Sequence, residues 1–236
     1  MNLTIMRLAL QALVGQRRGL VILALPVLLV ALAGVLRALT GEPVSANAVV
    51  VEVGIALVVP LVALLAANGV LGPEIDDGSV VYLLSTPVSR YAVAASKFVV
   101  AAGVAAVAAV AGLLGATLAG GLSGRWVVVS LVVGVAGAVL YTALFSAVAA
   151  ATRHGMIAGL VYVTVVESLL GRFLDGFRYV SVRAVAERLG EVAGDVDLPV
   201  SDLSTTYAVV ASVVLLVVGV AAAGWRLARF QLKGDE

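Results

Sequence analysis

The sequence predicts an all-α integral membrane protein that crosses the bilayer six times. Hydrophobic residues make up 62% of the 236 residues and charged residues only 12%, and the mean hydropathy is +1.16. This composition supplies too little polar surface to cover a soluble globule of that length. The apolar residues also form long stretches, and a stretch of about 20 residues crosses a hydrocarbon core of roughly 30 Å. The predicted spans are 19–36, 53–71, 92–122, 126–151, 156–170 and 207–225.

The predicted spans differ in length. The third and fourth are longer than a bilayer requires, so we expect them to tilt or to extend into water. The fifth is short, so we expect it to be completed by residues 172–177 or to bend back partway. The first starts late and lacks a small-residue cleavage site, so we expect it to remain in the protein rather than to be removed as a signal peptide.

The positions of lysine and arginine predict the orientation, because short cytoplasmic connections carry an excess of these residues. One set of connections holds most of them: Arg7, Arg17, Arg18, Arg90, Lys97, Arg153, Arg226, Arg229 and Lys233. Apart from the long segment 171–204, the opposite set holds Arg37 and Arg125. We therefore expect both termini to be cytoplasmic, segment 171–204 to be extracytoplasmic, and the protein to lie in the cell (plasma) membrane.

Residues 1–18 are predicted to form an amphipathic helix at the cytoplasmic interface. Apolar residues recur there at helical spacing, with polar and basic residues on the other faces. The apolar positions are Leu3, Met6, Leu10, Leu13 and Val14. The alternative is a frayed lead into the first span.

A second amphipathic helix is predicted in the outer segment 171–204, where it would rest on the membrane or on the bundle. An apolar stripe at helical spacing defines it, and Arg183 and Glu187 lie four residues apart on the other face, where they can pair. The stripe consists of Val182, Val185, Ala186, Leu189, Val192 and Ala193. We expect this helix to cap the outer mouth of whatever the bundle encloses.

A polar segment separates the second and third spans and must face water. Pro73 can begin a helix there, because its missing N–H is not needed in a first turn, and the acidic residues that follow favour the positive end of the helix dipole. Thr86 precedes Pro87 and is disfavoured in helical geometry, so this helix should stop near Ser85. Ser89 is a plausible N-cap for the next helix. Segment 73–90 therefore predicts a short helix and a turn that can transmit force from a soluble partner.

The residues of this segment carry a family resemblance. The order Glu74, Gly78, Leu83-Leu84, Thr86-Pro87-Val88-Ser89-Arg90 and Lys97 resembles the first cytoplasmic loop of ABC-2 type transporter permeases. The resemblance is greatest to the small six-span group that includes the permease of the nitrous oxide reductase maturation system, and it extends to the order of spans and amphipathic segments.

The resemblance implies that residues 1–236 form a single ABC-2 type transmembrane domain. It also implies that a coupling helix, Asp76 to Leu84, docks on an ATP-binding cassette subunit, and that a permease homodimer works with two such subunits. The coupling residues implied are Glu74, Asp76, Asp77, Gly78, Val81, Leu83, Leu84, Pro87, Ser89 and Arg90.

The chain is predicted not to be an enzyme, because it cannot supply a standard ATPase site. A phosphate-binding loop needs a lysine followed by serine or threonine, but Lys97 precedes Phe98 and Lys233 precedes Gly234. ATP and Mg would therefore bind to the partner subunit, and we expect no cofactor in this chain. With one histidine, three methionines and no cysteine, the chain has few soft metal ligands. Its net charge of +1 gives no field that would favour nucleic acid.

Three further places carry candidate polar residues. Arg153 and His154 lie in the turn before the fifth span, where they are solvated or form a second contact with the soluble partner. Glu167 is the candidate intramembrane functional charge, because ionisable groups within spans are expensive and often functional; the alternatives are snorkelling or pairing with Arg172. Glu52 and Arg37 are expected at the outer interface, where they can pair.

These observations predict the permease subunit of an ATP-driven exporter that is embedded in membrane lipid. The apolar interior suits a hydrophobic or amphipathic substrate, and the direction of transport follows from the resemblance alone. One alternative is a non-transporting membrane scaffold or sensor that recruits a protein through segment 73–90. Another is an intramembrane enzyme, for which Glu167 would be the sole plausible acid at membrane depth.

Overall fold

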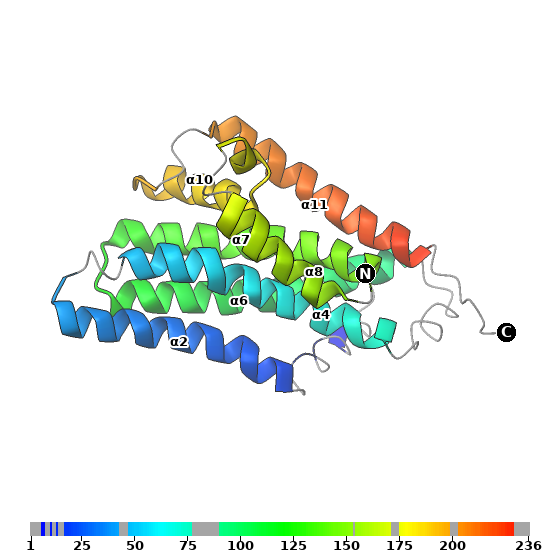
Figure 1. Ribbon diagram of the computed structural model, residues 1–236, viewed down its shortest axis with the longest axis horizontal. Coiled ribbons are helices and arrows are strands. Elements are labelled where there is room, and N and C mark those ends of the chain that lie inside the picture. The colour runs from blue at the N-terminus through cyan, green and yellow to red at the C-terminus, as the bar shows by residue number, and fades with distance from the viewer. Residues whose placement is uncertain are drawn as a thin grey trace.

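The computed structural model describes residues 6, 7, 10, 13, 17–42, 47–76, 90–152, 154–170, 175–198 and 203–228. Within this set, the side chains of residues 17, 18, 71–76, 90, 170, 175, 177, 227 and 228 are not described. Every element in the described ranges is a helix (Figure 1). In chain order they are α2 (Arg17–Thr40), η1 (Val49–Val58), α4 (Val59–Asp76), α6 (Arg90–Ala119), α7 (Gly124–Ala151), α8 (Gly155–Val161), η2 (Tyr162–Leu170), η3 (Asp175–Tyr179), α10 (Val182–Gly194) and α11 (Thr205–Ala228).

Five described helices are long and apolar enough to cross a membrane: Gly19–Thr40, Val49–Val70, Tyr91–Ala119, Gly124–Ala151 and Thr205–Arg226. The prediction of an all-α integral membrane protein is therefore confirmed. The sixth predicted span corresponds to the shorter apolar helix Gly155–Leu169, which extends only about 22 Å at 1.5 Å per residue. The count of six spans is not confirmed.

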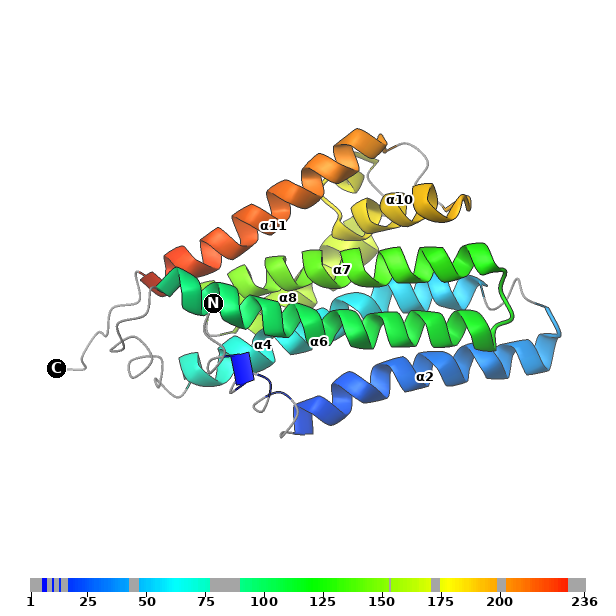
Figure 2. The ribbon, with the colours of Figure 1, turned by 180° about the vertical axis from the view of Figure 1, so that it is seen from behind.

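Small residues let the long helices pack closely. A side chain at Gly112 of α6 would lie 3.0 Å from Pro26 of α2, and one at Gly134 of α7 would lie 2.8 Å from Val110 of α6. Such close approach is typical of membrane helices, which gain van der Waals contact at small residues. The buried hydroxyls of Thr117 and Ser130 also join α6 to α7 at 2.7 Å. Figure 2 shows α2 beside α6 on this side of the bundle.

The bundle has two ends, which we name by residues that lie there. At the His154 end, α4 finishes, α6 begins and α8 begins (Figure 1). At the Arg125 end, α6 turns into α7 through Gly121, whose φ of +65° suits glycine. The guanidinium of Arg37 lies at the same turn and donates to the Ala119 carbonyl at 3.3 Å. The predicted pairing of Arg37 with Glu52 is therefore wrong, since Glu52 faces Arg183 of α10 instead, at 3.6 Å.

Two shorter helical segments lie one after the other along α7. Gly155, at the start of the first, approaches Asn68 and Ala149 at the His154 end. The second is α10. Its Ala186 lies against Gly137 of α7, and it ends at Gly194, where an added side chain would lie 2.9 Å from the Arg125 carbonyl. Figure 1 shows α8 and α10 following each other beside α7. The helix predicted in segment 171–204 thus packs on the bundle. It lies along the side of α7, whereas the prediction placed it across the mouth of the bundle.

Two of the N-terminal residues that are described, Met6 and Leu13, pack against the bundle. Met6, Arg7, Leu10 and Leu13 are helical, and the Leu13 side chain is fully buried. It fills the space beside Gly69 of α4, where an added side chain would lie 2.6 Å from Leu13. Leu13 therefore inserts between the helices at the His154 end. The other residues of the predicted interfacial helix lie outside the described part of the chain.

Candidate functional site

The predicted coupling residues fall mostly outside the described part of the chain. Glu74 and Asp76 lie at the end of α4, and Arg90 is the first residue of α6. The remaining ones, Asp77, Gly78, Val81, Leu83, Leu84, Pro87 and Ser89, are among the residues that are not described. The prediction that a new helix begins at Pro73 is wrong, because α4 continues through Pro73 to Asp76. A proline here forgoes only the bond to the Gly69 carbonyl, close to where the helix ends anyway.

The two helices that flank this segment are joined by a buried lysine. Lys97 of α6 is 3% exposed, and its Nζ donates to the Val70 carbonyl of α4 at 3.2 Å. A buried ammonium that lost such partners would be strongly disfavoured. Two residues earlier on α4, the buried Asn68 approaches Gly155 at the start of α8. Helices α4, α6 and α8 are therefore held together near the end of α4 and the start of α6.

The second candidate contact lies at the same end. His154 is exposed and precedes α8, and its backbone N–H donates to the Thr152 hydroxyl at 3.2 Å. Arg153 is not among the described residues. His154 lies at the end of the bundle where α4 finishes and α6 begins. This position suits a solvated turn residue and also a second contact with a soluble partner.

Glu167 connects η2, which continues α8, to the start of α10. Its side chain is in the last turn of η2 and is 6% exposed. The carboxylate accepts hydrogen bonds from the backbone N–H of Val182 at 2.9 Å, the Tyr162 hydroxyl at 3.1 Å and the Ser181 hydroxyl. The N–H of Arg183 is a fourth donor at 3.4 Å. Glu167 thus neutralises the first turn of α10, where unpaired N–H groups and the helix dipole favour an anion.

Arg183 lies beside Glu167 and binds two further acids, Glu187 and Glu52. We call these four residues the polar junction. The Nε of Arg183 donates to Glu187 at 2.6 Å, which confirms the predicted pair, and its Nη2 lies 3.6 Å from Glu52 of η1. The face that was predicted to lie opposite the apolar stripe is nevertheless buried at Glu187, which is 3% exposed. The predicted apolar stripe is also partly wrong: Val192 and Ala193 are exposed. Gly190 and Gly194 pack against α7 in their place, since helices approach most closely at residues without side chains.

The Arg183–Glu187 pair sits where burial and attraction compete. Burial raises the pKa of the Glu187 carboxyl above its ordinary value, although the Arg183 guanidinium acts to lower it. Burial would lower the pKa of Arg183, but the Glu187 carboxylate, its hydrogen bond and the Glu52 carboxylate act against burial, and the net effect is a raised pKa. Because a guanidinium stays protonated in proteins, Glu187 is the member of the pair whose charge can change.

Both acids that reach α10 from neighbouring helices lie in π-helical segments. Glu52 belongs to η1 and Glu167 to η2. Segments of π-helix are rare and occur often at functional sites. Tyr141 of α7 adds a hydroxyl that is fully buried and, among the described residues, without a hydrogen-bond partner. The junction therefore gathers acids, a base and hydroxyls from four parts of the bundle.

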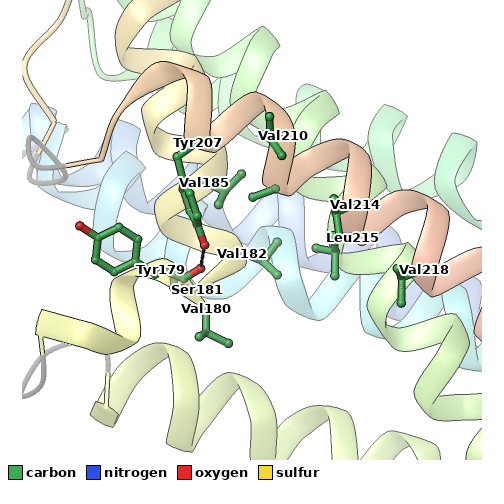
Figure 3. Close-up of a pocket in the computed structure, with 11 residues that line it drawn as sticks. Tyr179, Val180, Ser181, Val182, Val185, Tyr207, Val210, Val214, Leu215 and Val218 are labelled. Atoms are coloured by element: carbon green, nitrogen blue, oxygen red, sulfur yellow. Dashed lines mark hydrogen bonds between the residues drawn. The ribbon is translucent and has the colours of Figure 1, made fainter.

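A groove of about 360 Å³ lies between the start of α10 and helix α11. Tyr179, Ser181 and Val182 line one wall, and Val210, Val214 and Val218 follow one another along α11 (Figure 3). The Tyr207 hydroxyl donates to the Tyr179 carbonyl, and the two rings meet edge to face with centroids 5.3 Å apart. The groove is apolar along α11 and polar where these tyrosines and Ser181 meet.

Sequence reasoning identified Glu167 but missed its partners. Ser181 precedes the apolar stripe of α10, which is an N-cap signal, and its hydroxyl accepts from the Ala184 N–H at 3.1 Å. The donors Tyr162 and Val182 carried no such signal, because they depend on how η2 and α10 meet. The groove joins residues of η3, α10 and α11 that no periodicity links.

The long apolar helices and their buried polar contacts define a helical integral membrane protein. A family model described as ABC-2 family transporter protein matches residues 17–170, which is more than half of the chain. The chain therefore belongs to the ABC-2 family of transporter proteins, as the resemblance predicted. The narrower resemblance to the nitrous oxide reductase maturation group stays a prediction. A comparison with curated proteins gives no match.

Proposed function

We propose that this chain is the membrane-spanning permease subunit of an ATP-binding cassette exporter, with ATP and Mg bound by a separate subunit. The observation that carries the proposal is the family match over residues 17–170, which includes all of segment 73–90. In this proposal the helix Asp76 to Leu84 docks on the ATP-binding subunit, and two permease copies assemble with two such subunits in the plasma membrane, with their termini in the cytoplasm.

The arrangement at the His154 end supports this role. Lys97 ties α6 to α4, and Asn68 of α4 approaches the start of α8. A movement imposed on segment 77–89 would therefore act on three helices together. The helix from Val49 to Asp76 is also continuous from this end to Glu52, whose carboxylate faces Arg183 of α10. Docking at one end can thus displace contacts at the other without any break in the helix.

The proposed substrate is a hydrophobic or amphipathic compound. The side chains that the described helices bury are mainly valine, alanine and leucine. The described residues also contain no group of three or more histidine, cysteine or acidic side chains that could hold a metal ion. An apolar interior accepts an apolar molecule without the desolvation that a sugar or an ion would require.

Co-expression with an ATP-binding cassette subunit, followed by reconstitution, tests the proposal. We expect the two to co-purify and ATP hydrolysis to rise when substrate is present. Leu84→Asp and Arg90→Glu should abolish transport, whereas the matched changes Leu39→Asp and Arg125→Glu at the Arg125 end should not. The proposal fails if no ATPase subunit associates and if the first pair of variants leaves transport intact.

The same experiment separates the alternatives. A scaffold or sensor that recruits a protein through segment 73–90 would co-purify with its partner but would show no substrate-stimulated ATP hydrolysis. An intramembrane enzyme that uses Glu167 would turn over substrate without ATP. In the structure Glu167 is engaged by four donors, which is the environment of a structural anchor.

A further inference from the structure

The groove between α10 and α11 has the polarity of a site for a single-chain amphipathic molecule. Its long wall consists of Val210, Val214 and Val218, which recur every four residues on α11 and lie on one face of that helix. Three lining residues carry hydroxyl groups, Tyr179, Ser181 and Tyr207, and the Tyr179 hydroxyl points away from the other two (Figure 3). No residue that lines the groove is charged. Small-molecule sites share this pattern of apolar walls with a few placed polar groups, and begin at about 300 Å³.

The position and size of the groove decide between a hydrocarbon chain and a helix from a second copy. The groove runs beside α11, which is one of the five helices of membrane length, and Val214 is half exposed. Between Val210 and Val218 the helix rises about 12 Å, and an α-helix is about 10 Å or more in diameter. A volume of about 360 Å³ over that length is too small for such a helix but accommodates an alkyl chain.

The hydrogen bonds at the polar end define the head group. Tyr207 donates its only hydroxyl proton to the Tyr179 carbonyl, and Ser181 donates its proton to Glu167. Both hydroxyls can therefore only accept a further hydrogen bond, and Ser181, which already accepts from the Ala184 N–H, has one lone pair left for it. The carboxylate behind Ser181 already holds four donors, so nothing at this end calls for a cation. The matching head group is an uncharged donor, such as an alcohol or an amide N–H.

We infer that this groove binds a long-chain alcohol or amide, with its chain along α11 and its head at Tyr207 and Ser181. The inference rests on the proposed function only in assigning such molecules to the transported class. In this site Glu167 has a second role. It holds Ser181 and the first turn of α10 in place, and these residues form the wall against which the head group binds.

Photolabelling in phosphatidylcholine vesicles tests the inference without ATP or a partner subunit. The probe is a hexadecanol analogue that carries a diazirine in its chain. We expect adducts on α11 to concentrate at Val210 and Val214. Unlabelled hexadecanol should reduce them by about tenfold, whereas its methyl ether, which lacks the donor, should compete much less. Adducts spread equally over Val209, Val210, Val213 and Val214, or equal competition by alcohol and ether, would show contact with bulk lipid only and overturn the inference.

Matched variants sharpen the test. Val214→Trp fills the groove and should lower labelling by about tenfold, whereas Val213→Trp, on a neighbouring exposed position outside the groove, should leave it unchanged. Equal effects of the two variants would contradict the site. If either variant fails to fold, the labelling pattern on the wild-type protein decides whether the groove binds the probe.

Because the chain contains no cysteine, Val214→Cys can report a second copy: a disulfide between two copies would show that this face is an interface. Failure of these tests with an intact ATPase complex would reject the groove and leave the proposed function standing.

Discussion

The carboxylate of Glu167 lies 2.9 Å from the backbone nitrogen of Val182, so a side chain in the last turn of η2 caps the first turn of α10. The two segments meet beside α7, with η2 on one side of the junction and α10 on the other. Because the carboxylate is buried, its hydrogen bonds are not replaced by water if they break. This contact therefore determines where α10 begins.

Glu167→Ala should loosen α10 and destabilise the protein. The substitution leaves the Val182 N–H and the Ser181 hydroxyl without their acceptor, and each buried unpaired group costs about 1–3 kcal/mol. Glu167→Gln keeps an acceptor oxygen and should lose less. Hydrogen exchange of residues 182–186 in lipid nanodiscs measures the effect directly, with faster exchange expected in the order wild type, Gln, Ala. Identical exchange in all three proteins would show that the cap is not needed.

Lys97→Met should weaken the connection between α4 and α6 while preserving the volume of the side chain. The Val70 carbonyl loses a charged donor, and hydrogen bonds to charged groups are worth about 1.5–3 kcal/mol. In the reconstituted complex we expect ATP hydrolysis to persist and its stimulation by substrate to fall.

The control for Lys97→Met is Arg125→Met. It removes a cation from the other end of the bundle, where Arg125 and Asp195 form an exposed pair at 3.2 Å. Exposed pairs contribute about 0–1 kcal/mol, so this change should leave the stimulation intact. Equal loss in both variants would contradict a specific role for Lys97.

Much of this fold follows from local sequence, whereas the polar junction does not. Uninterrupted apolar stretches place the five long helices, and the apolar spacing around Val182 and Val185 identifies α10. The errors concern what lies opposite each residue. Glu187 is four residues from Arg183, so their pairing is local; its burial depends on α10 packing along α7. Glu52 meets Arg183 rather than Arg37 for the same reason, since the partner comes from a distant segment. Segment 77–89 lies outside the described residues, so its coupling role stays a prediction.

Glu187 should make stability fall as the pH rises. Burial raises its pKa in the folded protein above the ordinary value of 4.5. The folded state therefore binds this proton more tightly than the unfolded state, and the contribution is fully present below the unfolded pKa and is lost as the pH rises through the folded pKa. Chemical unfolding in detergent from pH 4 upwards should show a decline that Glu187→Gln lacks. The pKa of Arg183 is also raised, so its contribution is lost only at strongly alkaline pH.

The difference between wild type and Glu187→Gln isolates this one group from the other acids of the chain. Glu52 and Glu167 also lie near Arg183, and both remain in the variant. A difference that grows in the opposite direction, with wild type gaining stability as the pH rises, would mean that attraction to Arg183 outweighs burial.

Gly190→Ala should push α10 away from α7, because an added side chain would overlap Val133. Overpacking of this kind costs about 1–3 kcal/mol. The matched control is Gly103→Ala in α6, where no atom lies within 4 Å of the added carbon. Alanine at an open helical position is favoured over glycine by about 0.5–1 kcal/mol. Thermal unfolding in one detergent should therefore move in opposite directions, with a lower midpoint for Gly190→Ala and a slightly higher one for Gly103→Ala. A raised midpoint for Gly190→Ala would show that α10 does not pack tightly on α7.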